Sequence, residues 1–375
     1  MLGTMQERQL TLDHFVNRAE TYFPDREIVT NTAAGLQRTT YGAWADRTHR
    51  LAGVLDNLGI SAEGRVATFA WNTARHLELY FAAPCSGRVL HTLNLRLFPE
   101  QLTYIVNHAE DEVIFVDRSL LGLLVPRVGE FNTVKHIVVM DDGVPNEIPS
   151  FDGGPEVHDY EELLAGAERT EFRCADEWAA ASMCYTSGTT GNPKGVTYTH
   201  RSTYLHTMAA MLADTIGVTE ADVILPVVPM FHANAWGLAH AAVASGAKLV
   251  QPGPDLSPGT LARLIEEEKV TLAAGVPTIW MGVVEELEGR DTSALRVVPC
   301  GGSAVPTSLS KRFEEVTGLP ILQAWGMTET SPVGSVAKVI SSLEDSSQEK
   351  LDELRASQGL PVLGAELRAV TPDGE

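Results

Sequence analysis

Apolar residues recur along the chain at two different spacings. Stretches in which they return every three or four positions predict helices, and short continuous runs rich in β-branched residues predict buried strands. Helices are predicted over residues 40–58 and from Pro99, Pro258 and Pro306 onward, since proline is favoured in a first helical turn. Strands are predicted at residues 65–70, 112–117 and 136–141. Such strands separated by helices indicate an α/β fold whose mostly parallel sheets are covered on both faces.

Two polar stretches interrupt this pattern. Residues 142–178 are rich in Gly, Pro and acidic residues, and we interpret them as a surface connection between two sheet units. Residues 341–356 predict a polar helical excursion. The chain shows no internal repeat and no low-complexity tract.

The chain is strongly acidic. Its 375 residues carry 28 Lys and Arg against 49 Asp and Glu, a formal net charge of −21. This charge argues against broad binding to nucleic acid or to an anionic lipid surface, because both need a basic face. It leaves room for a small anionic ligand held by backbone amides and one or two cations.

Targeting signals and cysteine pairs are absent from the sequence. No apolar run approaches the ~18 residues of a membrane span, and the N-terminus lacks the apolar segment of a signal peptide. The four cysteines, Cys85, Cys174, Cys184 and Cys300, are far apart and show no metal-ligand spacing. We interpret them as reduced, buried thiols of a cytoplasmic protein.

The strongest chemical feature is the segment 185–196, which reads YTSGTTGNPKGV. It follows an apolar run and contains three glycines, four Ser and Thr hydroxyls and Lys194. Glycines permit a tight turn with positive φ, and successive backbone N–H groups in such a turn form an anion-binding nest. The ligand that fits this nest is a polyphosphate.

This loop is not a Walker A motif, since Lys194 is preceded by Pro193 and followed by Gly195. A generic Gly/Ser/Thr loop is more often a hairpin without a ligand. The density of hydroxyls and glycines around one lysine favours the phosphate-binding interpretation here.

The loop resembles the phosphate loop of the adenylate-forming superfamily, which includes acyl-CoA synthetases, luciferases and nonribosomal-peptide adenylation domains. A second signature of that superfamily, WGMTETSP, stands at residues 325–332. Residues 227–236, 275–278 and 301–304 are similar to the versions in fatty acyl-CoA synthetases, and residues 97–111 resemble bacterial medium- and long-chain fatty acyl-CoA ligases. The resemblance covers essentially the whole chain.

The resemblance implies the large N-terminal domain of the adenylate-forming fold, with two αβαβα sheet subdomains and the start of a small β-barrel. We place the first α/β sheet subdomain at residues 1–178, the second, with the phosphate loop and adenine site, at 179–355, and the start of the barrel at 356–375. Family members continue into a small C-terminal domain that carries a lysine used in adenylation. We therefore expect a truncated N-terminal domain that binds ATP or an acyl-adenylate weakly and makes little acyl-CoA.

The reaction that the resemblance implies has two halves. A carboxylate attacks the α-phosphate of ATP to give an acyl-adenylate and pyrophosphate, and the thiol of coenzyme A then displaces AMP. The substrates would be a fatty acid, ATP and coenzyme A, with Mg²⁺ as the cofactor at the phosphate oxygens. A homodimer is possible by the same resemblance.

The resemblance also assigns site residues. ATP or AMP would be bound by Thr186, Ser187, Gly188, Thr189, Thr190, Gly191, Lys194, Gly302, Ser303, Ala304, Gln323, Ala324, Trp325, Gly326 and Thr328. The acyl group would be bound by His232, Ala233, Trp236, Val276, Pro277 and Trp280. The catalytic residues would be Lys194, His232, Thr328 and Glu329, and the magnesium ligands would be Thr186 and Glu329.

Within these sets the resemblance also implies individual roles. Trp325 would stack on adenine, because an indole offers a large aromatic face. Thr328 would contact the α-phosphate, and His232 would orient the carboxylate. Ala324 stands where the family often has glycine, so its methyl group would narrow the nucleotide pocket.

Plainer interpretations of the same side chains exist. Glu329 would then be a solvated acid and His232 a satisfied structural histidine. Trp236 and Trp325 would then be ordinary packing residues.

Two other functions stay open at this stage. An aryl-CoA ligase or a short thioether-acid CoA ligase would use the same site, since an apolar pocket discriminates one methylene by only ~1–3 kcal/mol. A catalytically silent nucleotide- or acyl-binding module would have lost phosphate-loop or magnesium residues, yet Lys194, Thr328 and Glu329 are all present.

Overall fold

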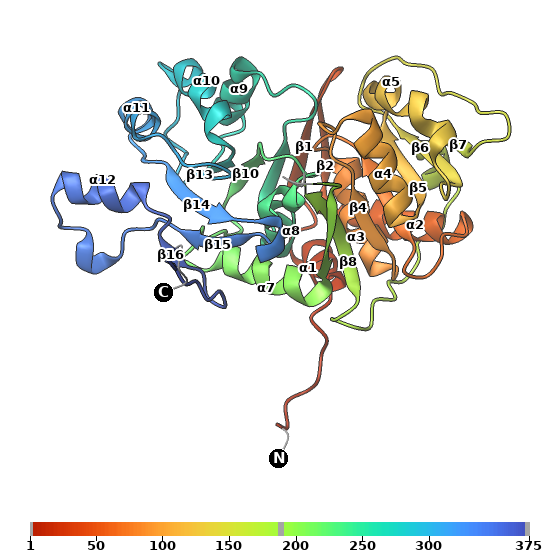
Figure 1. The fold of residues 1–375 in the computed structure, drawn as a ribbon, viewed down its shortest axis with the longest axis horizontal. Helices are drawn as coiled ribbons and strands as arrows, with labels where there is room; N and C mark the ends of the chain where they lie inside the picture. Colours follow the sequence, from red (N-terminus) through yellow and green to blue (C-terminus); the bar gives the residue numbers. More distant parts are fainter. Residues whose placement is uncertain (1–2, 187–190, 372–375) are drawn as a thin grey trace. The chain divides into compact units, whose positions relative to one another are not determined.

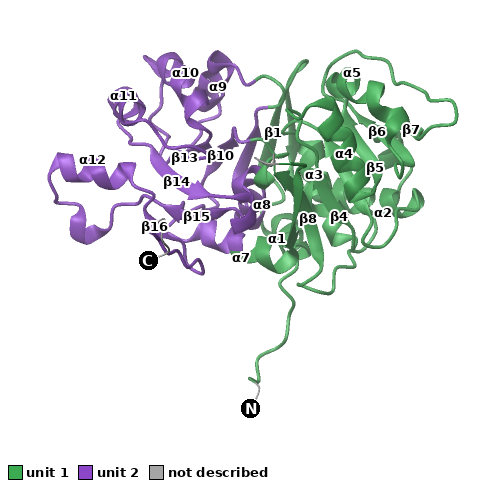
Figure 2. Cartoon of the chain, in the orientation of Figure 1, with its two compact units in different colours: residues 1–205, 229–234, 253–255 green, residues 206–228, 235–252, 256–375 purple. Residues whose placement is uncertain are grey.

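The computed structural model describes residues 3–186 and 191–371. The chain forms two compact units (Figure 2). Unit 1 consists of residues 1–205, 229–234 and 253–255, and unit 2 consists of residues 206–228, 235–252 and 256–375. Each unit is described by itself.

Unit 1 is built on a seven-stranded sheet with the strand order β7-β6-β5-β3-β4-β8-β9 (Figure 1). The first six strands in this order run parallel, and β9 pairs antiparallel with β8. The strands are β3 (Arg65–Phe69), β4 (Val89–Thr92), β5 (Asp111–Asp117), β6 (His136–Met140), β7 (Glu156–Asp159), β8 (Ala180–Thr186) and β9 (Lys194–Thr199). An antiparallel hairpin joins β1 (Glu27–Thr32) to β2 (Gly35–Thr40).

Helices cover both faces of this sheet. On one face, Leu102, Ile105 and Val106 of α4 (Pro99–Ala109) share a buried core with side chains of β5 and β6. On the other face, Phe115 of β5 meets the ring of Tyr160 in α6 (Tyr160–Ala165). Each such apolar side chain contributes about 1.5–3 kcal/mol when fully buried. The remaining helices of unit 1 are α1 (Asp13–Tyr22), α2 (Tyr41–Asn57), α3 (Ala74–Cys85), η1 (Arg118–Leu120), α5 (Leu121–Leu124) and η2 (Val125–Glu130).

Unit 2 contains two smaller groups of strands. In the first, β10 (Val223–Pro226) lies between β11 (Lys248–Gln251) and β12 (Leu272–Ala274), and both pairings are parallel. In the second, β13 (Pro299–Cys300) pairs parallel with β14 (Leu322–Gly326), which continues antiparallel through β15 (Val333–Val336) to β16 (Leu360–Pro361).

The helices of unit 2 surround these strands. They are α8 (Leu238–Ser245), α9 (Pro258–Glu267), α10 (Pro277–Leu287), α11 (Thr307–Thr317), η4 (Thr328–Thr330), η5 (Ser341–Leu343) and α12 (Gln348–Ala356). Of these, η5 and α12 lie in the stretch 341–356 that was predicted as a polar helical excursion. Two further segments, α7 (His200–Met211) and η3 (Ala233–Gly237), lead from unit 1 into unit 2. No described helix combines the length and the apolar composition that crossing a membrane requires.

The predicted α/β class and the strongly periodic elements are confirmed. The helices α2, α4, α9 and α11 and the strands β3, β5 and β6 lie within one or two residues of the predicted positions. The interpretation of residues 142–178 as a surface connection is wrong in part, because this stretch contains β7 and α6. Tyr160 and Leu164 of α6 are buried, which adds the segment to the layered core.

The compact units also differ from the predicted domain limit at 178/179. Strands β8 and β9 lie beyond that limit, yet they extend the sheet of unit 1 through the backbone hydrogen bonds between β4 and β8. Residues 356–371 belong to unit 2, where β16 pairs with β15. The division into two sheet subdomains and a barrel stays a prediction.

Candidate functional site

The predicted phosphate loop connects the antiparallel strands β8 and β9 of unit 1. Thr186 is paired with Lys194 at the loop end of this hairpin, and the Thr186 hydroxyl lies 3.5 Å from the Lys194 carbonyl oxygen. Gly191 is exposed and has a φ of +109°, a conformation that other residues rarely adopt. Ser187, Gly188, Thr189 and Thr190 lie outside the described residues.

Lys194 is exposed, and no carboxylate among residues 3–186 and 191–371 forms an ion pair with it. Its ammonium group therefore keeps all three donors for a ligand. A lysine with this freedom beside a glycine-rich turn is suited to an anion such as phosphate.

Tyr185 supports the base of the loop from inside the sheet. Its hydroxyl lies 2.6 Å from Nδ1 of His108, and its ring is 5.1 Å from that of His91. Burial raises the pKa of Tyr185 to about 12, so the hydroxyl stays protonated while it shares its hydrogen bond with His108. A side chain on Gly195 would start 3.1 Å from Cζ of Tyr185, so glycine permits this close packing.

A buried pair behind this tyrosine was not predicted from the sequence. Nδ1 of His91 lies 2.8 and 2.9 Å from the two carboxylate oxygens of Asp111, and both side chains are fully buried. Burial raises the pKa of Asp111, and the neighbouring imidazole opposes this shift. The two residues stand on β4 and at the start of β5, so only the parallel sheet brings them together.

The segment 229–234, which carries His232, is also part of unit 1. The Met230 amide donates to Oδ1 of Asn72 at 2.7 Å, and the Tyr80 hydroxyl donates to the Met230 carbonyl oxygen. Asn234 donates from Nδ2 to the Ser182 hydroxyl at 2.9 Å, and Ser182 belongs to β8. The segment is therefore anchored to the strand that leads into the phosphate loop.

The side chain of His232 is exposed to solvent, and its ring makes no hydrogen bond within the described part of the chain. Protein atoms around the ring, together with the Arg96 guanidinium, lower the pKa of His232. Its imidazole is therefore neutral near pH 7 and keeps one donor and one acceptor for a ligand.

The backbone after His232 is unusual. Ala233, Asn234, Ala235 and Trp236 have φ values of 44°, 49°, 51° and 55°, and Gly237 follows with 75°. A left-handed conformation costs an L-residue roughly 1–2 kcal/mol. Four consecutive cases persist only when their surroundings hold them, and such strain clusters at functional sites.

Residues of the predicted acyl and adenine sets meet in unit 2. A methyl group on Gly302 would lie 3.4 Å from Cγ1 of Val276 and 3.9 Å from Cζ2 of Trp236. A methyl group on Gly301 would lie 3.6 Å from the Trp236 ring and only 2.4 Å from the Ala324 carbonyl oxygen. Trp236 and Val276 therefore border the glycine turn that precedes Ser303 and Ala304, both of which are exposed.

Trp325 lies on β14 opposite Ser335 of β15, and its ring passes over the bare backbone of Gly334. A side chain on Gly334 would approach Cζ3 of Trp325 to 2.6 Å, and one on Gly326 would collide with the Pro332 carbonyl. Trp325 is partly exposed, as an aromatic stacking surface must be.

The acidic residue of the second signature is also exposed. Within η4 the side chain of Thr328 is buried, whereas Glu329 is exposed and forms no ion pair within the described residues. The Glu329 carboxylate in unit 2 and the partly exposed Thr186 hydroxyl in unit 1 are each oxygen donors of the kind that magnesium prefers. A magnesium site that combines the two residues stays a prediction.

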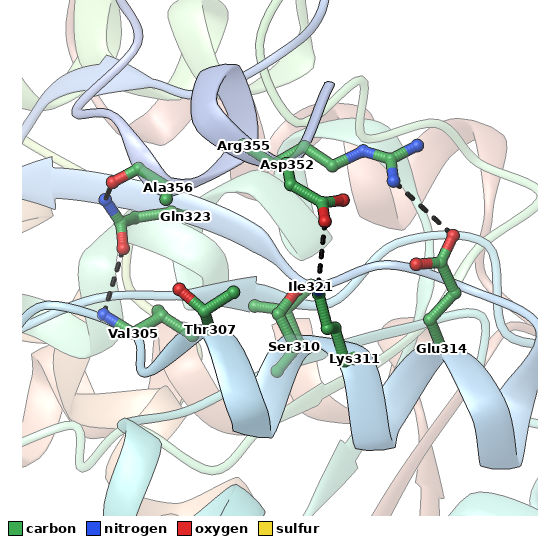
Figure 3. A pocket seen from close by; sticks show the side chains of 10 residues that line it. All are labelled: Val305, Thr307, Ser310, Lys311, Glu314, Ile321, Gln323, Asp352, Arg355 and Ala356. Carbon is green, nitrogen blue, oxygen red and sulfur yellow. Dashed lines mark hydrogen bonds and ion pairs between the residues drawn. The ribbon is translucent and has the colours of Figure 1, made fainter. Parts of the chain in front are cut away.

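Two predicted contact residues lie inside unit 2. The Gln323 side chain accepts from the Val305 amide at 2.9 Å and donates to the carbonyls of Ala356 and Ser357 at 3.0 and 2.7 Å, next to a small cavity (Figure 3). The oxygen and the nitrogen of its amide are thus both hydrogen-bonded within the protein, and these bonds hold α12 to β14. Trp280 is fully buried and packs against Phe313 at 5.9 Å between ring centroids. Ala233 and Pro277 are buried as well.

Comparison with known proteins places the chain in one family. The AMP-binding enzyme family matches residues 16–375. The medium-chain-fatty-acid–CoA ligase of Ectopseudomonas oleovorans is 42% identical over 100% of this chain and 69% of its own length. The long-chain-fatty-acid–CoA ligase of Thermus thermophilus is 46% identical over 99% and 67%. The 3-methylmercaptopropionyl-CoA ligase of Ruegeria lacuscaerulensis is 42% identical over 100% and 70%.

Solved structures show the same fold at lower identity. The anthranilate CoA ligase AuaEII in complex with anthranoyl-AMP aligns with 100% of this chain and 69% of its own, with a TM-score of 0.85 at 21% identity. The N-terminal domain of FACL13 from Mycobacterium tuberculosis aligns with 97% and 85%, with a TM-score of 0.80 at 23% identity. Since the family match spans nearly the whole chain and relatives above 40% identity align end to end with it, this protein belongs to the family of AMP-binding enzymes.

Proposed function

We propose that this protein is an AMP-forming fatty acid–CoA ligase. The observation that carries the proposal is the exposed, unpaired Lys194 at the end of the β8–β9 hairpin, in a chain that is 42–46% identical to medium- and long-chain-fatty-acid–CoA ligases over its full length. The substrates are a fatty acid, ATP and coenzyme A, and we propose a cytoplasmic location on the basis of those substrates and the four unpaired cysteines. The homodimer stays a prediction.

The nucleotide is divided among small sets of residues in this proposal. Lys194, Thr186 and the loop residues Ser187, Gly188, Thr189, Thr190 and Gly191 bind the phosphates. Trp325 stacks on adenine, and the turn 302–304 together with Ala324 and Gly326 lines the base. Gln323 acts through its position in β14, because its side chain is occupied. Thr328 contacts the α-phosphate.

The first half-reaction forms a bond between the fatty carboxylate oxygen and the α-phosphorus, and it breaks the bond from that phosphorus to the β-phosphate oxygen. The carboxylate is ionised near neutral pH, so the protein needs no general base for this step. Neutral His232 orients the carboxylate by donating a hydrogen bond, and Lys194 stabilises the charge that develops on the phosphates. Glu329 and Thr186 would hold a magnesium ion in this proposal, and the ion would supply further positive charge at the phosphate oxygens.

In the second half-reaction the coenzyme A sulfur attacks the acyl carbon. The carbon–oxygen bond to AMP breaks, the thiol proton is lost to solvent, and AMP leaves. Trp236 and Val276 supply apolar contact for the acyl chain near this carbon. Trp280 and Pro277 support that wall from the interior of unit 2 in this proposal, and Ala233 stays a predicted acyl contact.

A second candidate substrate is a short thioether acid. The 3-methylmercaptopropionyl-CoA ligase of Ruegeria lacuscaerulensis is as similar to this chain as the medium-chain ligase of Ectopseudomonas oleovorans, at 42% identity each. The fatty acid and the thioether acid both present an aliphatic chain to the same apolar residues. The length of the acyl chain is therefore the property that distinguishes the two candidate substrates.

Calorimetry with non-hydrolysable acyl-sulfamoyl-adenosines tests the substrate class. The octanoyl analogue is expected to bind one per chain and at least about tenfold more tightly than the benzoyl analogue, because an apolar tunnel discriminates by ~1–3 kcal/mol. Tighter binding of the 3-methylthiopropanoyl analogue would favour the second candidate. Binding of the benzoyl analogue alone, or of none of the three, would contradict the proposal.

A further inference from the structure

Two histidines and a glutamate converge at the edge of the seven-stranded sheet in unit 1. His136 stands on β6, and Glu156 and His158 stand on β7, the edge strand that begins the sheet order (Figure 1). The parallel register pairs His136 with Glu156 and Val138 with His158. Glu156 and His158 are two residues apart on one strand, so their side chains share a face.

The ligand atoms of the three side chains surround one point. Nδ1 of His136 lies 3.2 Å from Nε2 of His158, and Oε2 of Glu156 lies 3.7 and 3.8 Å from these two nitrogens. Zinc bound tetrahedrally at about 2.0–2.1 Å places its ligand atoms roughly 3.3–3.4 Å from one another. The three atoms need to move by no more than a few tenths of an ångström to share one ion.

We propose that His136, Glu156 and His158 form a binding site for a divalent transition-metal ion, with zinc as the preferred ion. Imidazole ligands suit zinc, cobalt and nickel, whereas magnesium prefers oxygen donors alone. The side chains of His136 and His158 are 13% and 21% exposed, and Glu156 is 75% exposed. The ion is therefore reached from solvent, and a water molecule completes the coordination.

Nearby charged groups leave the three ligands free for this role. Lys135, which precedes His136, is 3.0 Å from Glu112 and is held by that carboxylate. Asp159, which follows His158, is paired with Arg118 at 3.4 Å. Among the residues that the structure describes, no other set of three His, Cys, Asp or Glu side chains gathers its ligand atoms this closely.

The proposed ion would cross-link the strands β6 and β7. β7 has four residues and a single sheet neighbour, β6, so few contacts hold it. An ion with ligands on both strands stabilises the folded state by mass action, because the unfolded chain does not hold the ligands together. This role is independent of ATP and magnesium.

Cobalt(II) and zinc titrations of the metal-stripped full chain test the site. One equivalent of Co²⁺ is expected to give the visible absorption of a low-symmetry site, and Zn²⁺ should displace it and raise the melting temperature. His158→Asn should weaken Zn²⁺ binding by more than about tenfold, since it removes one of three protein ligands. Glu156→Gln, at an exposed position that leaves the fold intact, should weaken it less.

Matched variants keep the result interpretable. Glu147→Gln removes an exposed carboxylate outside the cluster, and His14→Asn removes a histidine near the N-terminus, so neither should change the stoichiometry or the affinity. Mg²⁺ in place of Zn²⁺ should leave the melting temperature unchanged. No Co²⁺ or Zn²⁺ binding by the wild-type chain at micromolar concentration, or equal binding by wild type, His158→Asn and Glu156→Gln, would overturn the proposal.

Discussion

Lys194, His232 and Glu329 share an absence of internal polar partners for their side chains. None of the three forms an ion pair or a side-chain hydrogen bond within the described residues. In contrast, Arg47 lies 2.7 Å from the buried Glu78 and 2.9 Å from Glu161, and this network is internally satisfied. Polar groups without internal partners retain their full capacity for a ligand, which is why these three carry the proposed chemistry.

Replacing Lys194 with methionine should weaken ATP binding about ten- to one-hundredfold, because a charge-assisted hydrogen bond is worth about 1.5–3 kcal/mol. Lys350→Met removes a lysine that is paired with Glu353 on α12, and it serves as the matched control. Calorimetric titration with Mg-ATP measures both. Equal losses in the two variants would show only a general effect of net charge.

The buried His76 should make the free energy of unfolding depend on pH. It is fully buried, with Nδ1 2.9 Å from the Trp71 carbonyl and Nε2 2.9 Å from the Thr68 hydroxyl, and burial lowers its pKa from 6.5 to about 4. Between these values the unfolded chain binds more protons than the folded chain. The free energy of unfolding should therefore fall as the pH drops from 6.5 to 4, by roughly 3 kcal/mol from this residue.

Urea denaturation at several pH values checks this expectation. His76→Asn should show a shallower loss of stability between pH 6.5 and 4 than the wild type. Thr68→Val breaks the same hydrogen bond but keeps the titrating imidazole, so it should keep the steep dependence. Parallel pH profiles for wild type and His76→Asn would refute the assignment.

At the scale of elements, periodicity and proline signals predicted the long helices well. α2 and α4 have continuous apolar faces, and their positions follow from local sequence. β7 and the short helix α6 that follows it were missed. The four residues of β7 have mixed polarity and show no alternation typical of a strand, and β7 forms only through pairing with β6. Elements fixed by tertiary contacts leave little local signal.

The left-handed segment Ala233–Gly237 shows the same limit at the site. Gly237, and to a smaller degree Asn234, tolerate positive φ, whereas Ala233, Ala235 and Trp236 adopt that region against their own preference. The resemblance identified the segment as functional, but its strained backbone could not be inferred. The His91–Asp111 pair was equally hidden, because no motif links the two residues along the chain.

Gln323 gives an element-scale prediction that separates structure from ligand contact. Gln323→Glu removes the two donors to the carbonyls of Ala356 and Ser357 and should lower the free energy of unfolding by about 1–3 kcal/mol. ATP affinity, measured under conditions where the variant is folded, should change less than about twofold.

Gln358→Glu makes the same chemical change at an exposed position and is the control for added charge. A loss of ATP affinity in Gln323→Glu, with stability equal to that of the control, would restore the original assignment of this side chain to the nucleotide.

At the scale of the molecule, the acidic composition and the proposed ligand must be reconciled. A net charge of −21 repels ATP at long range, so attraction must come from a focused site of amides, hydroxyls and Lys194. The family and the α/β class were predictable, because two signatures and the strand–helix alternation point the same way. The extent of the first unit was not, since β8 and β9 continue its sheet past the expected limit.

Detection of octanoyl-adenylate by mass spectrometry tests the central claim most directly. The full chain, at a concentration equal to that of ATP, is incubated for hours with octanoate and Mg²⁺ so that even slow chemistry is visible. The account predicts octanoyl-AMP and pyrophosphate, formed up to about one equivalent, dependent on octanoate and reduced in Glu329→Gln. Binding of ATP without any octanoyl-AMP or pyrophosphate would instead identify a silent nucleotide-binding protein and contradict the account.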